Sequence, residues 1–207
     1  MPGFPVLGSF MKTLIAVITC DKYENRLAAI ENTWISDARK AGFDVQIFTG
    51  KRLQVPDDYL SLKLKTKALC QLALSEGYDR LLKIDDDTCV NVKRFKIITA
   101  DYAGIRIGPN DAGCGSLRIP DKPEGTYPHE YASGGAYWLS RRSMEIVAAA
   151  PFNDDWAEDR WVGQVLADEG IELEILPNYA FWNPWIDQIT VCTQFPDPQT
   201  LVGFYQR

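Results

Sequence analysis

The sequence predicts a single α/β domain with a mostly parallel central sheet flanked by helices. Residues 14–20 (LIAVITC) form a continuous apolar run of strand length, which is typical of a strand buried on both faces. A helical pattern and a second strand pattern follow it, so the chain begins with a β-α-β unit. Strand-like and helix-like segments then alternate along the 207 residues without an internal repeat or a linker, as in one large domain.

The first half of the chain supplies two helices and two further strands. Leu27, Ile30 and Trp34 recur at helical spacing and place one face of the first helix on a core. Gly42 and Gly77 follow the two helices, as glycine commonly does at a helix end. The elements expected here are a helix over residues 26–41, a strand over 44–49, a helix over 62–76 and a strand over 80–84.

The second half alternates in the same way. Ser140 suits the start of a helix that Pro151 ends. Residues 108–131 are rich in Gly, Pro and Asp, so we expect a long loop of the kind that is usually functional. The elements expected here are a short helix over residues 92–98, strands over 101–107 and 136–139, helices over 141–150 and 158–169, and a strand over 172–176.

Composition excludes several classes of protein. The formal net charge is -6, so a nucleic acid is not an expected partner. The five cysteines are scattered without a CxxC pair, which indicates reduced, buried thiols in a reducing compartment. The single histidine excludes a histidine-rich zinc site. No apolar run is long enough for a transmembrane helix. Residues 1–10 lack the features of a signal peptide and are expected to be a remnant or a disordered start, outside a domain over residues 11–207.

Three consecutive aspartates, Asp85, Asp86 and Asp87, directly follow the apolar strand over residues 80–84. In open α/β sheets, ligands bind beyond the carboxyl ends of the strands. Adjacent carboxylates repel each other, and all stay ionised only when a cation lies among them. Oxygen-only ligands suit Mg²⁺ or Mn²⁺, which can bridge two phosphates and neutralise a leaving diphosphate. We favour this metal site over the alternative, a solvated acidic turn that caps the next helix.

Residues 131–140 (YASGGAYWLS) are a second candidate segment. Gly134 and Gly135 permit a close approach of the backbone to a ligand. Tyr137 and Trp138 offer flat apolar faces that pack well against sugar rings. The alternative is a tight turn that enters a core strand, and the segment taken alone favours this alternative.

Glu158 and Asp159 open the last long helix of the pattern. Carboxylates are favourable at a helix N-terminus, so capping alone can explain the pair. The functional alternative is a general base. In a group transfer to a hydroxyl, the hydroxyl loses its proton as it attacks, and one positioned carboxylate can accept that proton.

Five segments in one order carry a resemblance to a known family. They are residues 26–34 (RLAAIENTW, similar to R-x-x-x-I-R-x-T-W), 58–66 (DYLSLKLKT, similar to D-x-Y-x-N-L-T-L-K-T), 83–91 (KIDDDTCVN, similar to K-x-D-D-D-x-x-V-N), 127–140 (similar to Y-P-x-Y-x-x-G-x-G-Y-x-L-S) and 158–163 (EDRWVG, similar to E-D-V-x-x-G). This order resembles glycosyltransferase family 31, the inverting β-1,3-galactosyl- and N-acetylglucosaminyltransferases, with the Fringe enzymes as relatives. The resemblance covers about residues 14–166, and five segments in order are hard to obtain by chance.

The resemblance implies a GT-A fold, a UDP-sugar donor and inversion at the anomeric carbon. It implies that Asp85 and Asp87 are the outer members of a DxD motif that holds Mn²⁺ or Mg²⁺. Asp87 would be the direct ligand, and Asp85 would lie near the ribose or a metal-bound water. Asp86 would face the donor sugar, and Asp159 would be the catalytic base.

The same resemblance places four further residues in the donor site. Thr19 and Arg26 would lie near the nucleotide, at the end of the first strand. Gly134 and Gly135 would form the floor of the sugar pocket. The acceptor would be a carbohydrate or glycoconjugate that enters beside them.

Three positions depart from the family pattern. Glu31 stands where the family has a second arginine, and Ser61 stands where it has asparagine. Cys192 stands where a late histidine acts as a further metal ligand, and a thiol is a poor ligand for a hard cation. The metal would then be held by aspartate, phosphates and water, or by another tail residue such as Asp187.

We therefore expect an inverting, metal-dependent glycosyltransferase that moves a hexose of galactose, glucose or N-acetylglucosamine type from a UDP-sugar to an acceptor hydroxyl. One alternative is a nucleotidyltransferase or phosphotransferase that uses the aspartates for metal, although no G-x-x-x-x-G-K-[ST] loop is present. A second alternative is a non-catalytic carbohydrate-binding relative. We expect a soluble cytoplasmic enzyme of microbial or viral type, with a Golgi-lumenal catalytic domain that has lost its anchor as the alternative. The sequence does not determine the oligomeric state.

Overall fold

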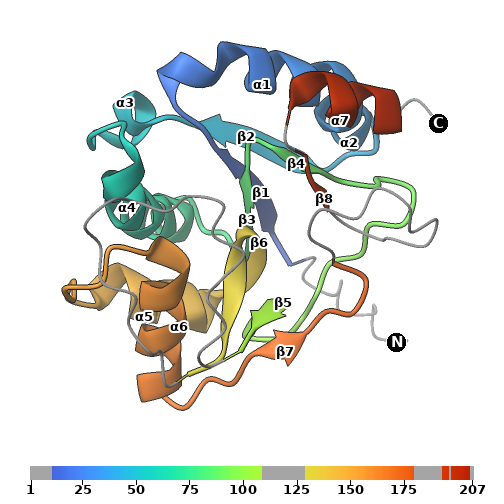
Figure 1. The fold of residues 1–207 in the computed structure, drawn as a ribbon. Coiled ribbons are helices and arrows are strands. Elements are labelled where there is room, and N and C mark those ends of the chain that lie inside the picture. The colour runs from blue at the N-terminus through green and yellow to red at the C-terminus, as the bar shows by residue number, and fades with distance from the viewer. Residues whose placement is uncertain (1–10, 109–128, 180–192, 196, 206–207) are drawn as a thin grey trace, which may run out of the picture.

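The computed structural model describes residues 11–108, 129–179, 193–195 and 197–205. Figure 1 shows a central sheet with helices on both of its faces. The strands are β1 (Thr13–Ile18), β2 (Asp44–Phe48), β3 (Arg80–Asp85), β4 (Thr88–Cys89), β5 (Tyr102–Ile107), β6 (Tyr131–Ser140), β7 (Glu174–Ile175) and β8 (Thr193–Gln194). The α-helices are α1 (Glu24–Ile30), α2 (Ser36–Lys40), α3 (Gly50–Leu53), α4 (Leu62–Ser75), α5 (Arg141–Ala149), α6 (Glu158–Asp168) and α7 (Pro198–Tyr205).

The main sheet has six strands in the order β2-β1-β3-β6-β5-β7, and β4 pairs with β8 in a separate two-stranded sheet. The pairs β1–β2, β1–β3 and β5–β7 are parallel, whereas β6 is antiparallel to both β3 and β5. Strand β6 is therefore the one strand of these six that runs in the opposite direction. The prediction of an α/β fold with a mostly parallel sheet flanked by helices is confirmed.

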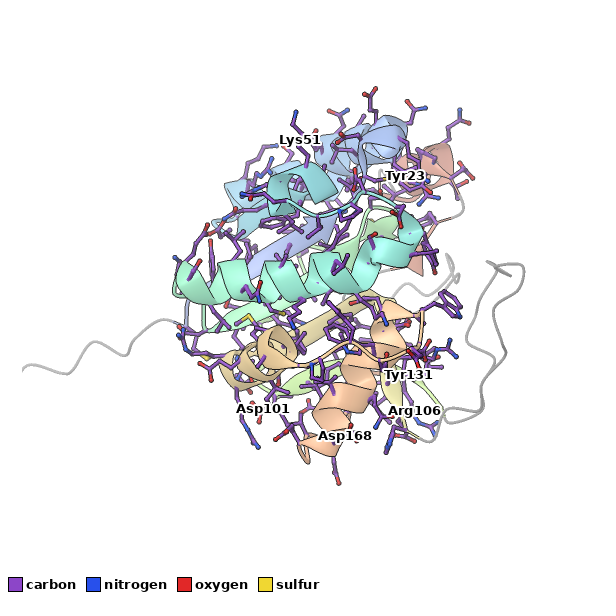
Figure 2. The ribbon with its side chains drawn as sticks, turned by 90° about the vertical axis from the view of Figure 1, so that its left-hand side faces the viewer. Tyr23, Lys51, Asp101, Arg106, Tyr131 and Asp168 are labelled. Atoms are coloured by element: carbon purple, nitrogen blue, oxygen red, sulfur yellow. The ribbon has the colours of Figure 1, made fainter. Side chains whose placement is uncertain are left out.

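Burial on both faces of β1 explains its continuous apolar run. Ile15 and Val17 pack into one core with Trp34, while Leu14 and Ala16 pack into the other core. The second core lies between the sheet and the layer of α4, α5 and α6, which faces the viewer in Figure 2. Each such side chain contributes about 1.5–3 kcal/mol through burial, so β1 holds the two layers together.

The helix expected over residues 26–41 is present from Glu24 to Lys40, but a π-helix over Glu31–Ile35 interrupts it between α1 and α2. Thr33 lies at the distortion, with φ -121° and ψ -112°, and its hydroxyl donates to the Ala29 carbonyl at 2.7 Å. Threonine hydroxyls that bond back to the preceding turn bend helices, and single π-turns accommodate one extra residue. The shift buries Trp34, whose Nε1 donates to the Thr88 carbonyl at 2.9 Å.

Several local predictions differ from the structure. The prediction of a short helix over residues 92–98 is wrong, because these residues form turns and non-helical chain. Their apolar pattern reflects Phe95, whose ring packs on Trp138 at 5.7 Å and on Phe43 at 4.9 Å between ring centroids. The strand expected over residues 136–139 is the end of the longer β6, and α3 had not been expected. Most of the loop expected over residues 108–131, and residues 1–10, lie outside the described residues.

The described cysteines are buried. Cys20, Cys70 and Cys89 have free thiols, as predicted, whereas Cys114 and Cys192 lie outside the described residues. In the part of the chain that the structure describes, none of the helices has the length and apolar character to span a membrane.

Candidate active site

The three aspartates lie where two neighbouring parallel strands end. Asp85 is the last residue of β3 and pairs in register with Ile18, the last residue of β1. Thr19 therefore lies beside Asp86, and its hydroxyl donates to Asp86 Oδ2 at 2.7 Å. The structure thus brings Thr19 next to the aspartates, whereas its expected place beside the nucleotide stays a prediction.

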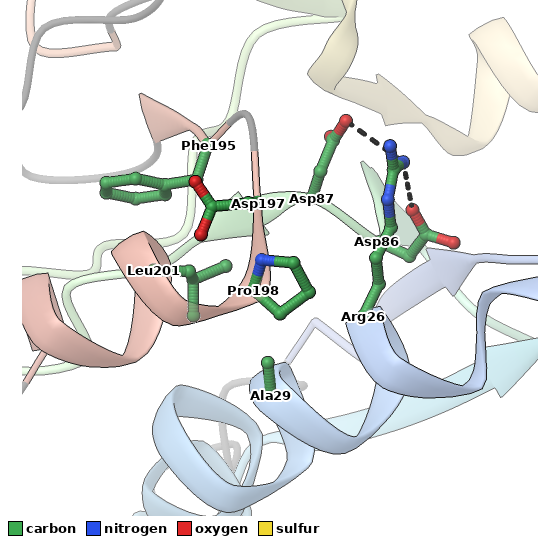
Figure 3. A pocket seen from close by; sticks show the side chains of 8 residues that line it. All are labelled: Arg26, Ala29, Asp86, Asp87, Phe195, Asp197, Pro198 and Leu201. Atoms are coloured by element: carbon green, nitrogen blue, oxygen red, sulfur yellow. Dashed lines mark hydrogen bonds and ion pairs between the residues drawn. The ribbon is translucent and has the colours of Figure 1, made fainter.

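Arg26 of α1 places a guanidinium between two of these carboxylates. Its Nη1 lies 3.1 Å from Asp86 Oδ1 and 3.3 Å from Asp87 Oδ2, and both contacts are drawn in Figure 3. Burial lowers the pKa of Arg26, but the hydrogen bond to Asp86 and the charge of Asp87 raise it overall. Arg26 thus remains charged and turns Asp86 toward the end of β1, where that carboxylate is almost fully buried.

Asp87 has an oxygen that no described residue satisfies. Its Oδ1 is buried and has no hydrogen-bond partner among the described residues. Burial, followed by the charge of Asp85, raises the pKa of Asp87 well above its ordinary value. Buried polar atoms normally have a partner, and repelling carboxylates stay ionised together when a cation is present. A divalent cation that prefers oxygen ligands fits these observations.

Asp87 would need ligands from outside the described side chains to enclose such a cation. Among the described residues, no group of three or more His, Cys, Asp or Glu side chains is arranged to hold a metal. Diphosphate oxygens and water can complete the coordination of Mg²⁺ or Mn²⁺. Cys192 and Asp187, considered above as the third ligand, lie outside the described residues.

Lys83 is a buried cation between the aspartates and α6. It lies in the middle of β3, and its Nζ donates to Asp85 Oδ1 and to the Gly134 carbonyl, both at 2.5 Å. Its Nζ also lies 3.7 Å from Glu158 Oε2. Burial lowers the pKa of Lys83, but the charges of Asp85 and Glu158 outweigh it and raise the pKa overall. Lys83 therefore stays protonated and joins the two acidic segments.

Glu158 and Asp159 have different environments although they are neighbours. Glu158 is 4% exposed, and its Oε1 accepts hydrogen bonds from the hydroxyls of Thr66, at 2.7 Å, and Tyr137. Asp159 is only partly buried, and its Oδ2 accepts from the Gly134 N–H at 3.0 Å. Burial first, and the charge of Glu158 second, raise the pKa of Asp159 to about 6. Glu158 is thus held inside the protein by two hydroxyl groups, while Asp159 keeps part of its surface exposed.

The glycines of β6 bring these groups together. Ile84 of β3 pairs with Ala136, so the register places Gly135 opposite Asp85, the last residue of β3, and Gly134 just past the end of the strand. A Cβ on Gly134 would lie 3.5 Å from Asp159 Oδ2 and 3.6 Å from Glu158 Oε2, so both carboxylates lie against this residue. The Gly134 N–H binds Asp159 and the Gly134 carbonyl binds Lys83, so the backbone of this residue connects the two side chains.

Tyr137 and Trp138 do not present faces to a ligand. Both side chains are fully buried, and Trp138 Nε1 donates to the Tyr179 hydroxyl at 2.6 Å. The alternative reading of this segment, entry into a core strand, is the correct one for these two residues. Strand alternation sends Trp138 to one core and Tyr137 to the other.

An ion pair between a buried lysine and a partly exposed aspartate fixes the loops around Thr19. Lys65 of α4 forms an ion pair with Asp57 and donates to the Thr19 carbonyl at 3.1 Å. Asp57 also accepts from the backbone N–H groups of Asp21 and Gly50, both at 2.9 Å. The loops after β1 and β2 are therefore tied to α4. Sequence reasoning missed Lys65 and Lys83, although a lysine within an apolar segment next to acidic residues is a signal for a buried ion pair.

The start of α7 closes the outer side of the aspartate turn. A hollow beside Asp87 is shown in Figure 3, with α7 on one side and α1 on the other. Asp197 lies at this hollow and accepts hydrogen bonds from the Thr200 N–H at 2.8 Å and the Thr200 hydroxyl at 2.7 Å. The remaining lining residues are Arg26, Ala29, Asp86, Phe195, Pro198 and Leu201.

Comparison with known proteins agrees with this arrangement. The family model described as Fringe-like matches residues 9–136. Comparison with curated protein sequences found no match. Among solved structures, the chain is similar to a glycosyltransferase involved in the glycosylation of the major capsid of PBCV-1. That similarity has a TM-score of 0.58 at 11% sequence identity, and it covers 94% of this chain and 98% of the other. The fold is thus of the GT-A type, and the chain belongs to the Fringe-like family of glycosyltransferases.

Proposed function

We propose that this glycosyltransferase moves a hexose from a UDP-sugar to the hydroxyl of a glycan or glycoconjugate, with a divalent metal and with inversion. The observation that carries the proposal is the link between Asp85 and Asp159. Lys83 binds Asp85 and the Gly134 carbonyl, and the Gly134 N–H binds Asp159. A carboxylate cluster suited to a cation and a separate carboxylate suited to a proton therefore flank one backbone segment.

The donor side of the site consists of the strand ends. In this proposal Asp87 and Asp85 hold Mn²⁺ or Mg²⁺, which neutralises charge on the departing diphosphate. Thr19 and Arg26 lie beside the nucleotide, and both bind Asp86, which faces the donor sugar in this proposal.

The floor of the donor sugar pocket lies on β6. We assign it to Gly134 and Gly135, of which Gly134 is partly exposed and Gly135 is buried. A Cβ at Gly134 would lie 3.5 Å and 3.6 Å from the two carboxylates of α6, so the absence of a side chain keeps the space between them narrow but open.

Asp159 acts as the base on the acceptor side. Its pKa of about 6 leaves it ionised at neutral pH and more basic than an ordinary aspartate. A base of this strength accepts a proton efficiently near neutral pH. Two backbone N–H groups, from Gly134 and Arg160, hold the carboxylate at 3.0 Å and 2.9 Å, so it is oriented before substrate binds.

Release of UDP from a panel of UDP-sugars, with and without Mn²⁺, tests the proposal. Asp159→Asn should reduce turnover by at least about 100-fold while UDP binding stays near that of the wild type, because proton transfer is lost but the nucleotide wall is intact. Asp87→Ala should weaken UDP binding as strongly as EDTA does.

Four outcomes would contradict the proposal. Turnover that survives Asp159→Asn would show that Asp159 is not the catalytic base. Donor binding that EDTA leaves unchanged would exclude the metal. Release of pyrophosphate in place of UDP would indicate a nucleotidyltransferase, and UDP-sugar binding without turnover would indicate a non-catalytic relative.

A further inference from the structure

Two aromatic rings meet at the surface beside the proposed base. Tyr59 lies in the 3-10 helix Tyr59–Ser61, and Trp156 lies in the segment before α6. Their ring centroids are 5.9 Å apart, with an angle of 41° between the ring planes. Tyr59 is 42% exposed and Trp156 is half-buried, so both rings retain surface that water contacts. These rings differ in this respect from Tyr137 and Trp138, which are fully buried.

Both rings are close to the carboxylates of the site. Trp156 lies three residues before Asp159 in the sequence. Burial first, and then the charges of Asp159 and Asp85, raise the pKa of Tyr59 to about 12. Tyr59 therefore lies within reach of the charges of both carboxylates, while part of the residue remains exposed to solvent.

The pair is held in place before any ligand arrives. The Arg160 guanidinium lies 5.4 Å over the Trp156 ring and 2.9 Å from Asp155 Oδ1. The Lys63 ammonium donates to the Asn153 carbonyl at 2.8 Å, which ties this segment to α4. A rigid aromatic surface loses little conformational entropy on binding, which favours recognition of a weak ligand.

We propose that Tyr59 and Trp156 form the subsite for a neutral pyranose acceptor, packed by its apolar face on the two rings with its reacting hydroxyl toward Asp159. The proposal rests on the proposed function, because it takes Asp159 as the base. A pyranose has a face of C–H groups and a rim of hydroxyls, which matches a ring surface bordered by carboxylates.

The surrounding charge selects against acidic acceptors. The charges that act on Tyr59 are those of Asp159, Asp85 and Glu158 against one cation, Lys83. Beside Trp156, Arg160 already has an acidic partner in Asp155. A uronic, sialic or phosphorylated sugar would bring a further negative charge to this position, and juxtaposed like charges are costly. The subsite therefore fits a neutral hexose or N-acetylhexosamine at the end of an acceptor glycan.

The opposing interpretation is that the ring pair only packs one segment against another. Saturation-transfer NMR separates the two interpretations without turnover. The full-length Asp159→Asn protein with UDP is mixed with the methyl β-glycosides of glucose, galactose and N-acetylglucosamine. We expect saturation of the C–H protons of one ring face in at least one glycoside, reduced at least about fivefold by an added Trp156→Ala or Tyr59→Ala.

Two further variants are controls. Tyr59→Phe keeps the ring and should keep most of the saturation. Phe152 is an exposed aromatic of the same segment, whose ring packs on Trp161 at 5.2 Å, so Phe152→Ala should leave the saturation unchanged. Absence of saturation for all three glycosides in the Asp159→Asn protein, or saturation that persists in Trp156→Ala, would overturn the subsite.

Turnover gives a second readout once a donor and an acceptor are identified. Trp156→Ala should raise KM for the acceptor by about 10-fold and raise it more than KM for the donor. An equal rise in both would indicate general distortion and would contradict the proposal. Failure of every UDP-sugar to release UDP would refute the proposed function, whereas the NMR result would still decide whether the rings bind a pyranose.

Discussion

Replacing Asp159 by asparagine should stabilise the folded protein while it abolishes transfer. Burial and the charge of Glu158 raise the pKa of Asp159 from its ordinary 3.8 to about 6. A shift of about 2 pKa units corresponds to about 3 kcal/mol by which folding disfavours the ionised side chain. Asp159 is partly exposed, so solvent screening reduces this cost. The asparagine oxygen can accept from only one of the two backbone N–H groups that the carboxylate binds, so we expect a gain toward the lower end of about 1–3 kcal/mol in Asp159→Asn.

The pH dependence distinguishes this cost from an ordinary packing effect. Because the pKa is higher in the folded state than in the unfolded state, the cost is complete above about pH 6. It decreases as the pH falls from about 6 to 3.8 and vanishes below that range, where Asp159 is protonated in both states. The variant should therefore exceed the wild type in stability at pH 8 and equal it near pH 3.8.

Thermal unfolding of the protein without nucleotide or metal measures the effect. For a chain of this size, a gain of 1–3 kcal/mol raises Tm by about 3–9 °C at pH 8. Asp154 is an exposed aspartate of the same segment, so Asp154→Asn is the control and should change Tm by less than about 1 °C. A variant no more stable than the wild type at pH 8, or equally stabilised at pH 8 and pH 4, would refute the reasoning.

Three further substitutions have outcomes that the structure defines. Glu158→Gln removes the negative charge that raises the pKa of Asp159, so the acidic limb of the pH profile of kcat/KM should move to lower pH. Gly163→Ala places a Cβ 2.4 Å from the Cβ of Tyr131, so urea denaturation should show a loss of about 1–3 kcal/mol. Lys65→Met removes the cation from Asp57, which is partly exposed and keeps two backbone N–H partners, so it should lower the free energy of unfolding by about 1–3 kcal/mol.

Each of these three has a result that would count against it. If the acidic limb of the kcat/KM profile of Glu158→Gln stays at the pH of the wild type, the charge of Glu158 does not raise the pKa of the base. A Cβ at Gly203 of α7 would have none of the described atoms within 4 Å, so Gly203→Ala is the control for Gly163→Ala and should not destabilise the protein. A Lys65→Met protein as stable as the wild type would show that the ion pair does not hold the loops after β1 and β2.

The parts of the fold that depend on local pattern could be predicted from the sequence. The apolar run of β1 and the helical spacing of α4, α5 and α6 lead directly to these elements. The direction of β6 could not be predicted, because strand direction depends on pairing with β3 and β5, which are distant in the chain. The π-helix at Thr33 could not be predicted either, since one additional residue in a turn leaves the apolar spacing nearly unchanged.

The candidate site divides in a similar way. Asp85, Asp86 and Asp87 stand at a strand end that the sequence itself marks, and Thr19 follows from the parallel pairing of β1 with β3. The separate roles of Glu158 and Asp159 depend on tertiary burial, which no local pattern encodes. The sequence predicts the aromatic surface in β6, but strand alternation buries Tyr137 and Trp138 in the two cores. The exposed pair, Tyr59 and Trp156, comes from segments whose sequences show no helical or strand periodicity.

The reversed strand has a consequence for attempts to change the donor preference of this enzyme. Strand β6 begins at the edge of the sheet where the site lies. The backbone of Gly134 therefore contacts Lys83 on the donor side and Asp159 on the acceptor side. Under the proposed assignment, a side chain introduced here to select another sugar would also displace the proton acceptor. Laboratory evolution toward new donors should therefore accept changes in the loops around β6 more readily than changes within it.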